Sequence, residues 1–198
     1  MSSLLGAADV RRLAEEIGTH PTKKWGQNFV IDPNTVRRIV RAADVQSADT
    51  VLEVGPGLGS LTLALVETGA SVIAVEIDPA LADRLPRTIE EFAPQSVGRV
   101  AVVQADALEV TELPAEPSVL VANLPYNIAT PLIVDLLVRV PPISKMLVMV
   151  QLEAAERFAA GPGSGQYGAV SVRIAHRARA RIVGHVPPTV FLPRPKVD

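Results

Sequence analysis

The segment Glu53-Val-Gly-Pro-Gly-Leu-Gly59 combines a carboxylate with three closely spaced glycines, directly after a short apolar run. Glycines at a strand-to-helix corner let the backbone approach a ligand closely, and the first turn of the helix offers free N–H groups. The third glycine comes one residue too early for the dinucleotide pattern G-x-G-x-x-G, and no G-x-x-x-x-G-K-[ST] pattern is present. The spacing therefore disfavours a pyrophosphate ligand. A simple tight turn without a ligand is the alternative to a binding loop.

Two further carboxylates end the next two apolar runs. Glu76 can accept hydrogen bonds from both hydroxyls of a ribose, and Asp106 can accept one from the exocyclic amine of an adenine ring. Because the carboxyl ends of parallel strands share one edge of a sheet, we expect both to lie in one ligand site with the glycine segment. A helix cap is the alternative explanation for either carboxylate alone.

The segment Asn123-Leu-Pro-Tyr-Asn127 follows the fourth apolar run. The Asn123 amide oxygen and a neighbouring carbonyl can accept both hydrogens of an NH₂ group, while Tyr126 offers a ring face to a planar base. The lone pair of an aryl amine is delocalised into its ring, and two acceptors favour the pyramidal, more nucleophilic nitrogen. The segment therefore predicts a reaction at a nucleobase amine, with a β-turn and a packed tyrosine as the alternative.

The elements that must position these groups alternate along the chain. Five short apolar runs, separated mostly by helix-compatible stretches, occupy residues 51–54, 71–75, 100–103, 119–122 and 146–150. A sixth strand is expected at 181–186. Continuous apolar strands are typical of a parallel sheet covered on both faces. We therefore predict an α/β, doubly wound, mostly parallel sheet whose first and fourth strands are neighbours, which brings Asn123 beside the glycine segment.

Two helices are predicted before the first strand. Helical spacing of Val10, Leu13 and Ile17 indicates the first, and Asp32-Pro33, an N-cap followed by proline, opens the second. Residues 22–29 have no clear period and are predicted to form a loop.

Composition indicates one globular domain. The 198 residues are 48% hydrophobic with a net charge of -2, which excludes disorder, coiled coil and collagen. The chain has no cysteine, so disulfides, thiolate metal sites and cysteine nucleophiles are excluded. No signal-peptide pattern or membrane-length apolar run occurs, and a cytoplasmic protein is expected.

Charge is distributed unevenly along the chain. Residues 1–41 hold seven Lys/Arg against four Asp/Glu, residues 171–198 hold six against one, and the middle is acidic. Two basic ends on one face would attract nucleic acid, although a solvated surface is the simpler explanation of charge alone.

Together the motifs resemble a known family. The glycine segment with Asn123–Tyr126 resembles the class I S-adenosylmethionine-dependent methyltransferases that act on adenine N6. Residues 24–29, 123–131 and 191–198 are similar to ribosomal RNA adenine N6,N6-dimethyltransferases, more narrowly the small-subunit, kasugamycin-sensitivity enzymes. The resemblance covers 20–198. It implies a Rossmann-like methyltransferase domain over 1–198, with 1–45 as an N-terminal helical extension and cofactor-covering loop.

The resemblance also implies an activity. Methyl groups would pass from S-adenosylmethionine, without a metal, to N6 of two adjacent adenosines near the 3' end of small-subunit ribosomal RNA in an immature 30S particle. The enzyme would be cytoplasmic, without membrane contact, and monomeric at full length. The alternatives are a large-subunit dimethylase of the antibiotic-resistance type, a family member recruited to transcription and a ribosome-assembly RNA-binding factor whose catalysis is dispensable.

Residue roles follow from the same resemblance. The implied catalytic residues, which grip or cover the target base, are Asn123, Leu124, Tyr126 and Phe191. The implied cofactor-binding residues are Gln27, Asn28, Val30, Glu53, Gly55, Gly57, Glu76, Ile77, Asp106, Ala107 and Asn123. Candidate contacts to RNA phosphates are Lys23, Lys24, Arg37, Arg38, Arg41, Arg173, Arg177, Arg179 and Arg181.

Two departures from the family pattern carry expectations of their own. Leu152 stands where family members usually have lysine, so one basic contact is expected to be missing. Family members also continue into a seventh strand and a small helical RNA-binding domain. We therefore expect a shortened chain whose sixth strand lacks a neighbour; such a chain is expected to keep cofactor binding and to lose productive RNA methylation.

Overall fold

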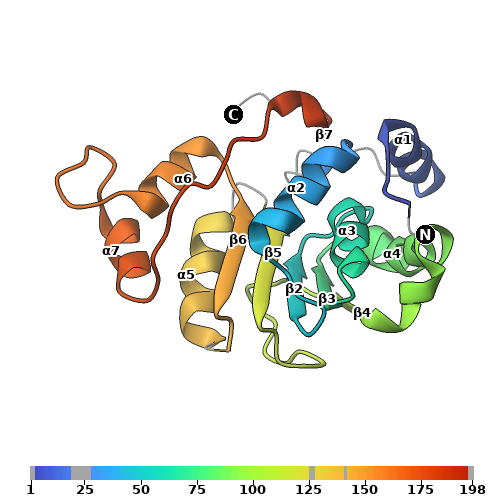
Figure 1. Ribbon diagram of the computed structural model, residues 1–198, viewed down its shortest axis with the longest axis horizontal. Helices are drawn as coiled ribbons and strands as arrows, with labels where there is room; N and C mark the ends of the chain where they lie inside the picture. Colours follow the sequence, from blue (N-terminus) through green and yellow to red (C-terminus); the bar gives the residue numbers. More distant parts are fainter. Residues whose placement is uncertain (1–2, 19–27, 125–127, 141, 196–198) are drawn as a thin grey trace.

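The computed structural model describes residues 3–18, 28–124, 128–140 and 142–195 (Figure 1). Its strands are β1 (Phe29–Val30), β2 (Thr50–Val54), β3 (Ser71–Glu76), β4 (Val100–Gln104), β5 (Val119–Asn123), β6 (Lys145–Met149) and β7 (Phe191–Leu192). Its α-helices are α1 (Ala7–Glu16), α2 (Pro33–Ala43), α3 (Ser60–Glu67), α4 (Pro79–Phe92), α5 (Ala129–Arg139), α6 (Leu152–Ala159) and α7 (Ala169–Ala175). Two short 3₁₀ helices span Pro94–Arg99 and Pro188–Val190.

Five of the strands form one parallel sheet in the order β4-β3-β2-β5-β6. The predicted α/β fold with a parallel sheet is confirmed, as are all five predicted strands to within a residue or two at each end. β2 pairs with β5, with Val51 opposite Val119, so the first and fourth predicted strands are neighbours as expected. β3 and β4 lie on one side of β2 in the sheet, and β5 and β6 lie on its other side. Folds of this kind form their ligand crevice at the point where the strand order switches sides.

Helices cover both faces of this sheet, which explains its continuous apolar strands. On one face, alternate strand residues such as Val51 pack with α1, α2, α3 and α4. On the other face, the residues in between, such as Leu52, pack with α5, α6 and α7. Each strand therefore contributes side chains to two apolar cores, and neither face can carry the polar alternation of a solvated strand.

Two helix starts follow from the residues at their caps. The Asp32 side chain accepts from the backbone N–H of Thr35 at 2.9 Å, and the Asp78 side chain accepts from that of Ala80 at 2.9 Å. A proline at the first helical position follows each aspartate and needs no N–H partner there. The predicted start at Asp32-Pro33 is confirmed.

The expected sixth strand is wrong. Residues 181–186 form no strand, and Ile182 and Val183 are 40% and 54% exposed. A strand needs a neighbour for its backbone hydrogen bonds, and among the described residues no strand pairs with this segment. The predicted loop over 22–29 is corrected at its end, where Phe29 belongs to β1 and pairs with β7. The rest of that loop up to residue 27 lies outside the described residues.

The described residues include no helix with both the length and the apolarity needed to cross a membrane.

Candidate active site

The glycine loop between β2 and α3 approaches two other segments of the backbone. Gly55, Gly57 and Gly59 have φ angles of +70°, +58° and +98°, a region that side chains disfavour. A Cβ atom on Gly57 would stand 2.9 Å from the ring of Phe29, and one on Gly55 would stand 3.9 Å from the backbone oxygen of Asn123. Glycine at these positions therefore lets the loop lie against both β1 and the end of β5.

Glu76, at the end of β3, binds the backbone of this loop through its carboxylate. Its Oε2 accepts from the Gly57 N–H at 3.0 Å, and its Oε1 accepts from the Asp78 N–H at 3.0 Å. The side chain is buried, which raises the pKa of its carboxyl, while these backbone hydrogen bonds oppose the rise. The loop N–H of Gly57 thus already has a carboxylate as its partner.

Glu53, near the end of β2, is 1% exposed and also lines the site. Thr62 Oγ1 donates to Glu53 Oε2 at 2.7 Å. Burial raises the pKa of Glu53 to about 8, the negative charge of Glu76 adds to the rise, and the Thr62 hydrogen bond opposes it. The Glu53 carboxyl is therefore mostly protonated at neutral pH.

Asp106 and Ala107 form a turn just beyond β4. The backbone N–H of Leu108 donates to Asp106 Oδ1 at 2.9 Å, and the N–H groups of Glu109 and Val110 donate to the Asp106 carbonyl at 2.9 and 3.0 Å. Asp106 therefore caps a turn and lines the cavity at the same time. The helix-cap alternative offered for this residue from sequence thus agrees with its turn bonds, whereas binding of an adenine amine stays a prediction.

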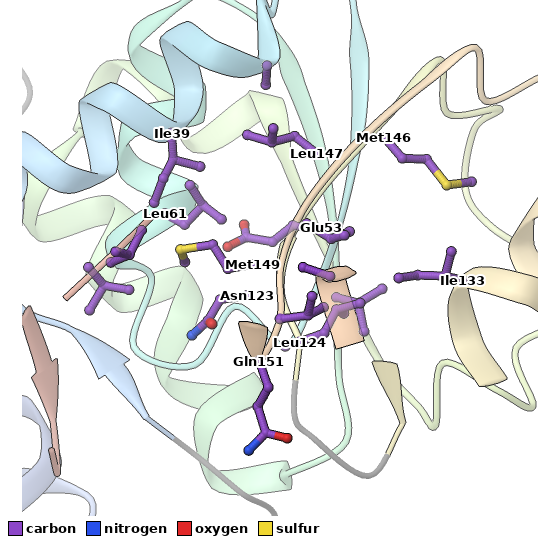
Figure 2. A pocket seen from close by; sticks show the side chains of 18 of the residues that line it. Ile39, Glu53, Leu61, Asn123, Leu124, Ile133, Met146, Leu147, Met149 and Gln151 are labelled. Carbon is purple, nitrogen blue, oxygen red and sulfur yellow. The ribbon is translucent and has the colours of Figure 1, made fainter. Parts of the chain in front are cut away.

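Asn123 ends β5 on the other side of the glycine loop. Its Nδ2 donates to the backbone carbonyl of Asn28 at 3.0 Å. The N–H of Leu124 donates to the carbonyl of Met149, which extends the β5–β6 pairing by one residue. Figure 2 shows the Asn123 amide in the cavity with Met149 and the Glu53 carboxyl close by. The amide is held through its nitrogen, so its oxygen is the group left to accept from a ligand.

β1 and β7 form a two-residue antiparallel ladder over this site, with Val30 opposite Phe191. The Ser60 hydroxyl donates to the carbonyl of Val30 at 2.7 Å, and the N–H of Ile31 donates to the carbonyl of Val190 at 2.8 Å. The ladder brings Phe191, from the far end of the chain, to the wall of the same cavity.

One cavity of about 1280 Å³ connects these groups. It continues beyond the strand ends into a groove between β6 and residues 177–188, so it is larger than one ligand site. The predicted catalytic and cofactor residues that lie within the described part of the chain all line it: Asn28, Val30, Glu53, Gly55, Gly57, Glu76, Ile77, Asp106, Ala107, Asn123, Leu124 and Phe191. Gln27 and Tyr126 lie outside the described residues.

Sequence reasoning missed Gln151 as a lining residue. Its side chain extends from the segment after β6 and lies below Asn123 and Leu124 in Figure 2. Its position directly after the fifth apolar run was the signal that could have found it, since ligands gather beyond strand ends. Among the described residues, no three Asp, Glu or His side chains form a group that could hold a metal ion.

The basic candidates within the described residues are exposed, and the two basic ends meet at one point. Arg38 Nη2 donates to the backbone carbonyl of His185 at 3.0 Å, which joins α2 to the segment that carries Arg179 and Arg181. Arg37 instead pairs with Glu67 at 3.3 Å. The remaining described basic candidates, exposed on α2, on α7 and just after α7, are Arg41, Arg173 and Arg177. Lys23 and Lys24 lie outside the described residues.

Residues 19–198 match the family model described as ribosomal RNA adenine dimethylase. A curated relative from Leifsonia xyli, named ribosomal RNA small subunit methyltransferase A, is 58% identical over 195 residues, covering 98% of this chain and 70% of the relative. The crystal structure of a dimethyladenosine transferase from Plasmodium falciparum has a TM-score of 0.75 and 30% identity, covering 86% of this chain and 60% of that one. The crystal structure of the 23S rRNA methyltransferase ErmE has a TM-score of 0.73 and 34% identity, covering 86% and 66%.

The chain thus spans between 60% and 70% of the length of these three proteins. The family model covers residues 19–198, a range that includes the motifs that line the cavity. The chain therefore belongs to the ribosomal RNA adenine dimethylase family.

Proposed function

We propose that this chain carries the site that transfers methyl groups from S-adenosylmethionine to adenine N6 in small-subunit ribosomal RNA. The observation that carries the proposal is the closeness of the glycine loop to Asn123. A Cβ on Gly55 would stand 3.9 Å from the Asn123 backbone oxygen, so the corner after β2 and the corner after β5 open into one cavity. A methyl donor on the loop and an amine held at Asn123 can therefore meet.

The charges of the loop side of the cavity suit S-adenosylmethionine better than a dinucleotide. Glu76 occupies the Gly57 N–H, which an anion-binding loop would offer to a phosphate. With Asp106 nearby in the lining, this side favours a cationic ligand over a pyrophosphate. Glu76 would hold the ribose hydroxyls, Asp106 with Ala107 the adenine, and the glycine loop with Asn28 the methionine end. When bound, S-adenosylmethionine supplies a methyl group activated by a sulfonium centre.

The Asn123 side of the cavity would hold the target base. Asn123 Oδ1 and the carbonyl of Leu124 would accept the two N6 hydrogens, which localises the nitrogen lone pair and makes it a better nucleophile. The bond from Asn123 Nδ2 to Asn28 fixes the amide beforehand, so little reorganisation is needed when the base arrives. Phe191 would cover the base from the β7 side. After one transfer, the remaining N6 hydrogen still has an acceptor, which permits a second transfer.

The small-subunit substrate is supported by the degree of similarity. Identity is 58% to the relative named for the small subunit and 34% to the 23S rRNA methyltransferase. The exposed arginines near the joined basic ends would bind RNA phosphates, and an immature 30S particle would be the partner. The site of action is then wherever that particle matures, which is the cytoplasm in a bacterium.

The first experiment is calorimetric titration of this chain with S-adenosylmethionine and, separately, with NAD. We expect saturable binding of the first and no binding of the second. The second experiment follows tritium from labelled S-adenosylmethionine into immature small or large subunits, using the longest form of the protein that the gene encodes. Label in N6,N6-dimethyladenine of small-subunit RNA is expected; NAD binding, or label only in large-subunit RNA, would overturn the proposal.

A further inference from the structure

Arg139, the last residue of α5, contacts the turn that carries Asp106 and Ala107. Its Nη2 donates to the backbone carbonyl of Ala107 at 2.8 Å, and its Nη1 donates to the backbone carbonyl of Val110. Its Nε donates to Asp135, one turn earlier in α5, at 2.6 Å. The guanidinium thus donates to two carbonyls of the turn and, at the same time, to the carboxylate of Asp135.

The contacts from Arg139 fix the position of the turn relative to α5, whereas the hydrogen bonds within the turn fix only its conformation. The N–H groups that converge on Asp106 close the turn internally. Arg139 ties that closed unit to α5, where Val110 and Ala107 also pack in the apolar core with Leu136. The Arg139 side chain is only 28% exposed, and hydrogen bonds from a charged donor are stronger than neutral ones.

α5 itself begins at Ala129, five residues after Leu124. One helix therefore runs from the segment that follows Asn123 to the turn beyond β4. Arg139 does not itself line the cavity, so it would act on a ligand there indirectly, and the turn is the lining segment that its guanidinium contacts.

We propose that Arg139 is a positioning residue. It holds Asp106 and Ala107 in the position where they can bind the 6-amino group of the cofactor's adenine. This inference rests on the proposed function, because it takes the ligand of that turn to be the adenine of S-adenosylmethionine. Without the guanidinium, the turn keeps its shape but loses its fixed distance from α5. The hydrogen bond from the adenine amine to the turn then weakens, while contacts to the ribose and the methionine end stay intact.

The test compares two ligands that differ at the adenine edge that would face the turn. S-adenosylhomocysteine carries the 6-amino group, and S-inosylhomocysteine carries an oxo group in its place and a hydrogen on N1. The unaltered chain is expected to prefer the first by roughly tenfold, the effect of one good hydrogen bond. Arg139→Ala is expected to weaken S-adenosylhomocysteine binding by about that factor and to leave S-inosylhomocysteine nearly unchanged, so the preference disappears.

Two further variants complete the design. Arg139→Lys should restore part of the preference, because an ammonium can reach one of the two carbonyls. Arg99→Ala removes an exposed arginine beside the start of β4 without touching the turn, and should keep the full preference. If Arg139→Ala does not fold, as judged by thermal unfolding, Arg139→Gln carries the same comparison.

The outcomes separate this inference from the proposed function. An Arg139 variant that keeps the roughly tenfold preference of the unaltered chain overturns the positioning role. Equal loss of both ligands shows a general structural role and also overturns it. Failure of the unaltered chain to bind either ligand overturns the proposed function instead.

Discussion

The two sides of the cavity are built from different chemistry. On the side of β2, β3 and β4, carboxyl groups dominate and are tied into the fold by short hydrogen bonds, as between Thr62 and Glu53. On the side of β5 and β6, the polar groups are the neutral amides of Asn123 and Gln151, among apolar side chains such as Leu124 and Met149 (Figure 2). In the proposed function, the first side would hold a cation and sugar hydroxyls, and the second an uncharged planar base. Variants on either side should therefore affect different measurements.

The largest expected effect is on the amide side. Asn123→Ala should lower the rate of methyl transfer by at least about 100-fold, because a pre-oriented acceptor at the reacting group is lost. Cofactor affinity should change by less than about threefold, since the carboxylates on the other side remain. Single-turnover transfer and calorimetry give the two numbers. A rate equal to that of the unaltered protein would remove Asn123 from the reaction.

On the carboxylate side, Glu76→Gln should weaken binding of S-adenosylhomocysteine by about 1–3 kcal/mol, or roughly 5- to 150-fold. The amide cannot accept from the Gly57 N–H, the Asp78 N–H and two ribose hydroxyls together. Glu112→Gln, at an exposed carboxylate outside the cavity, is the matched control. Equal affinities of the two variants by calorimetry would contradict the assignment of Glu76 to the site.

Glu53 should make stability depend on pH in a recognisable direction. Its pKa of about 8 in the folded protein lies above the ordinary value of 4.5, so the unfolded chain ionises first. The contribution of Glu53 is thus fully present below about pH 4.5 and is lost as pH rises toward 8. Glu53→Gln removes this loss.

The measurement is urea unfolding of both proteins at pH 5, 6.5 and 8, with the difference in free energy of unfolding taken at each pH. The variant should gain on the order of 3–4 kcal/mol relative to the unaltered chain between the lowest and highest pH. A difference that stays constant across the range would show that Glu53 does not titrate there.

The smallest expected effects are at two exposed arginines that line the groove beyond the strand ends. Arg179→Ala and Arg181→Ala should each weaken RNA binding by roughly two- to fivefold and lower the slope of log affinity against log salt by about 0.7–0.9. Cofactor binding should be unaffected by either. Arg99→Ala is the matched exposed control, and a slope indistinguishable from that control would exclude these arginines from the RNA surface.

The sequence predicted the sheet and much of the site because both depend on local patterns. Apolar runs mark the buried strands, and polar residues directly after them fall at the edge where ligands bind, as Glu76 and Asp106 do. Residues 181–186 include Ile182, Val183 and Val186 but form no strand, because strand formation depends on a partner that no local pattern supplies. Family resemblance, rather than spacing, pointed to Asn28 and Phe191.

Contacts between distant residues were the least predictable. The bond between Asn123 and Asn28 joins residues 95 positions apart, and the β1–β7 ladder joins the two ends of the chain. No sequence pattern marks Arg139, because its proposed role depends on the contact between the end of α5 and the turn beyond β4.

The Asn28 carbonyl has a consequence for the orientation of the Asn123 amide. A primary amide can sit in its place in two ways, related by a half-turn about the bond to the side chain, which exchange its oxygen and nitrogen. A carbonyl can only accept, so the half-turned amide would set two oxygens against each other. The residue just before β1 thus decides which end of the Asn123 amide is left for a ligand, and the choice is made before any ligand enters.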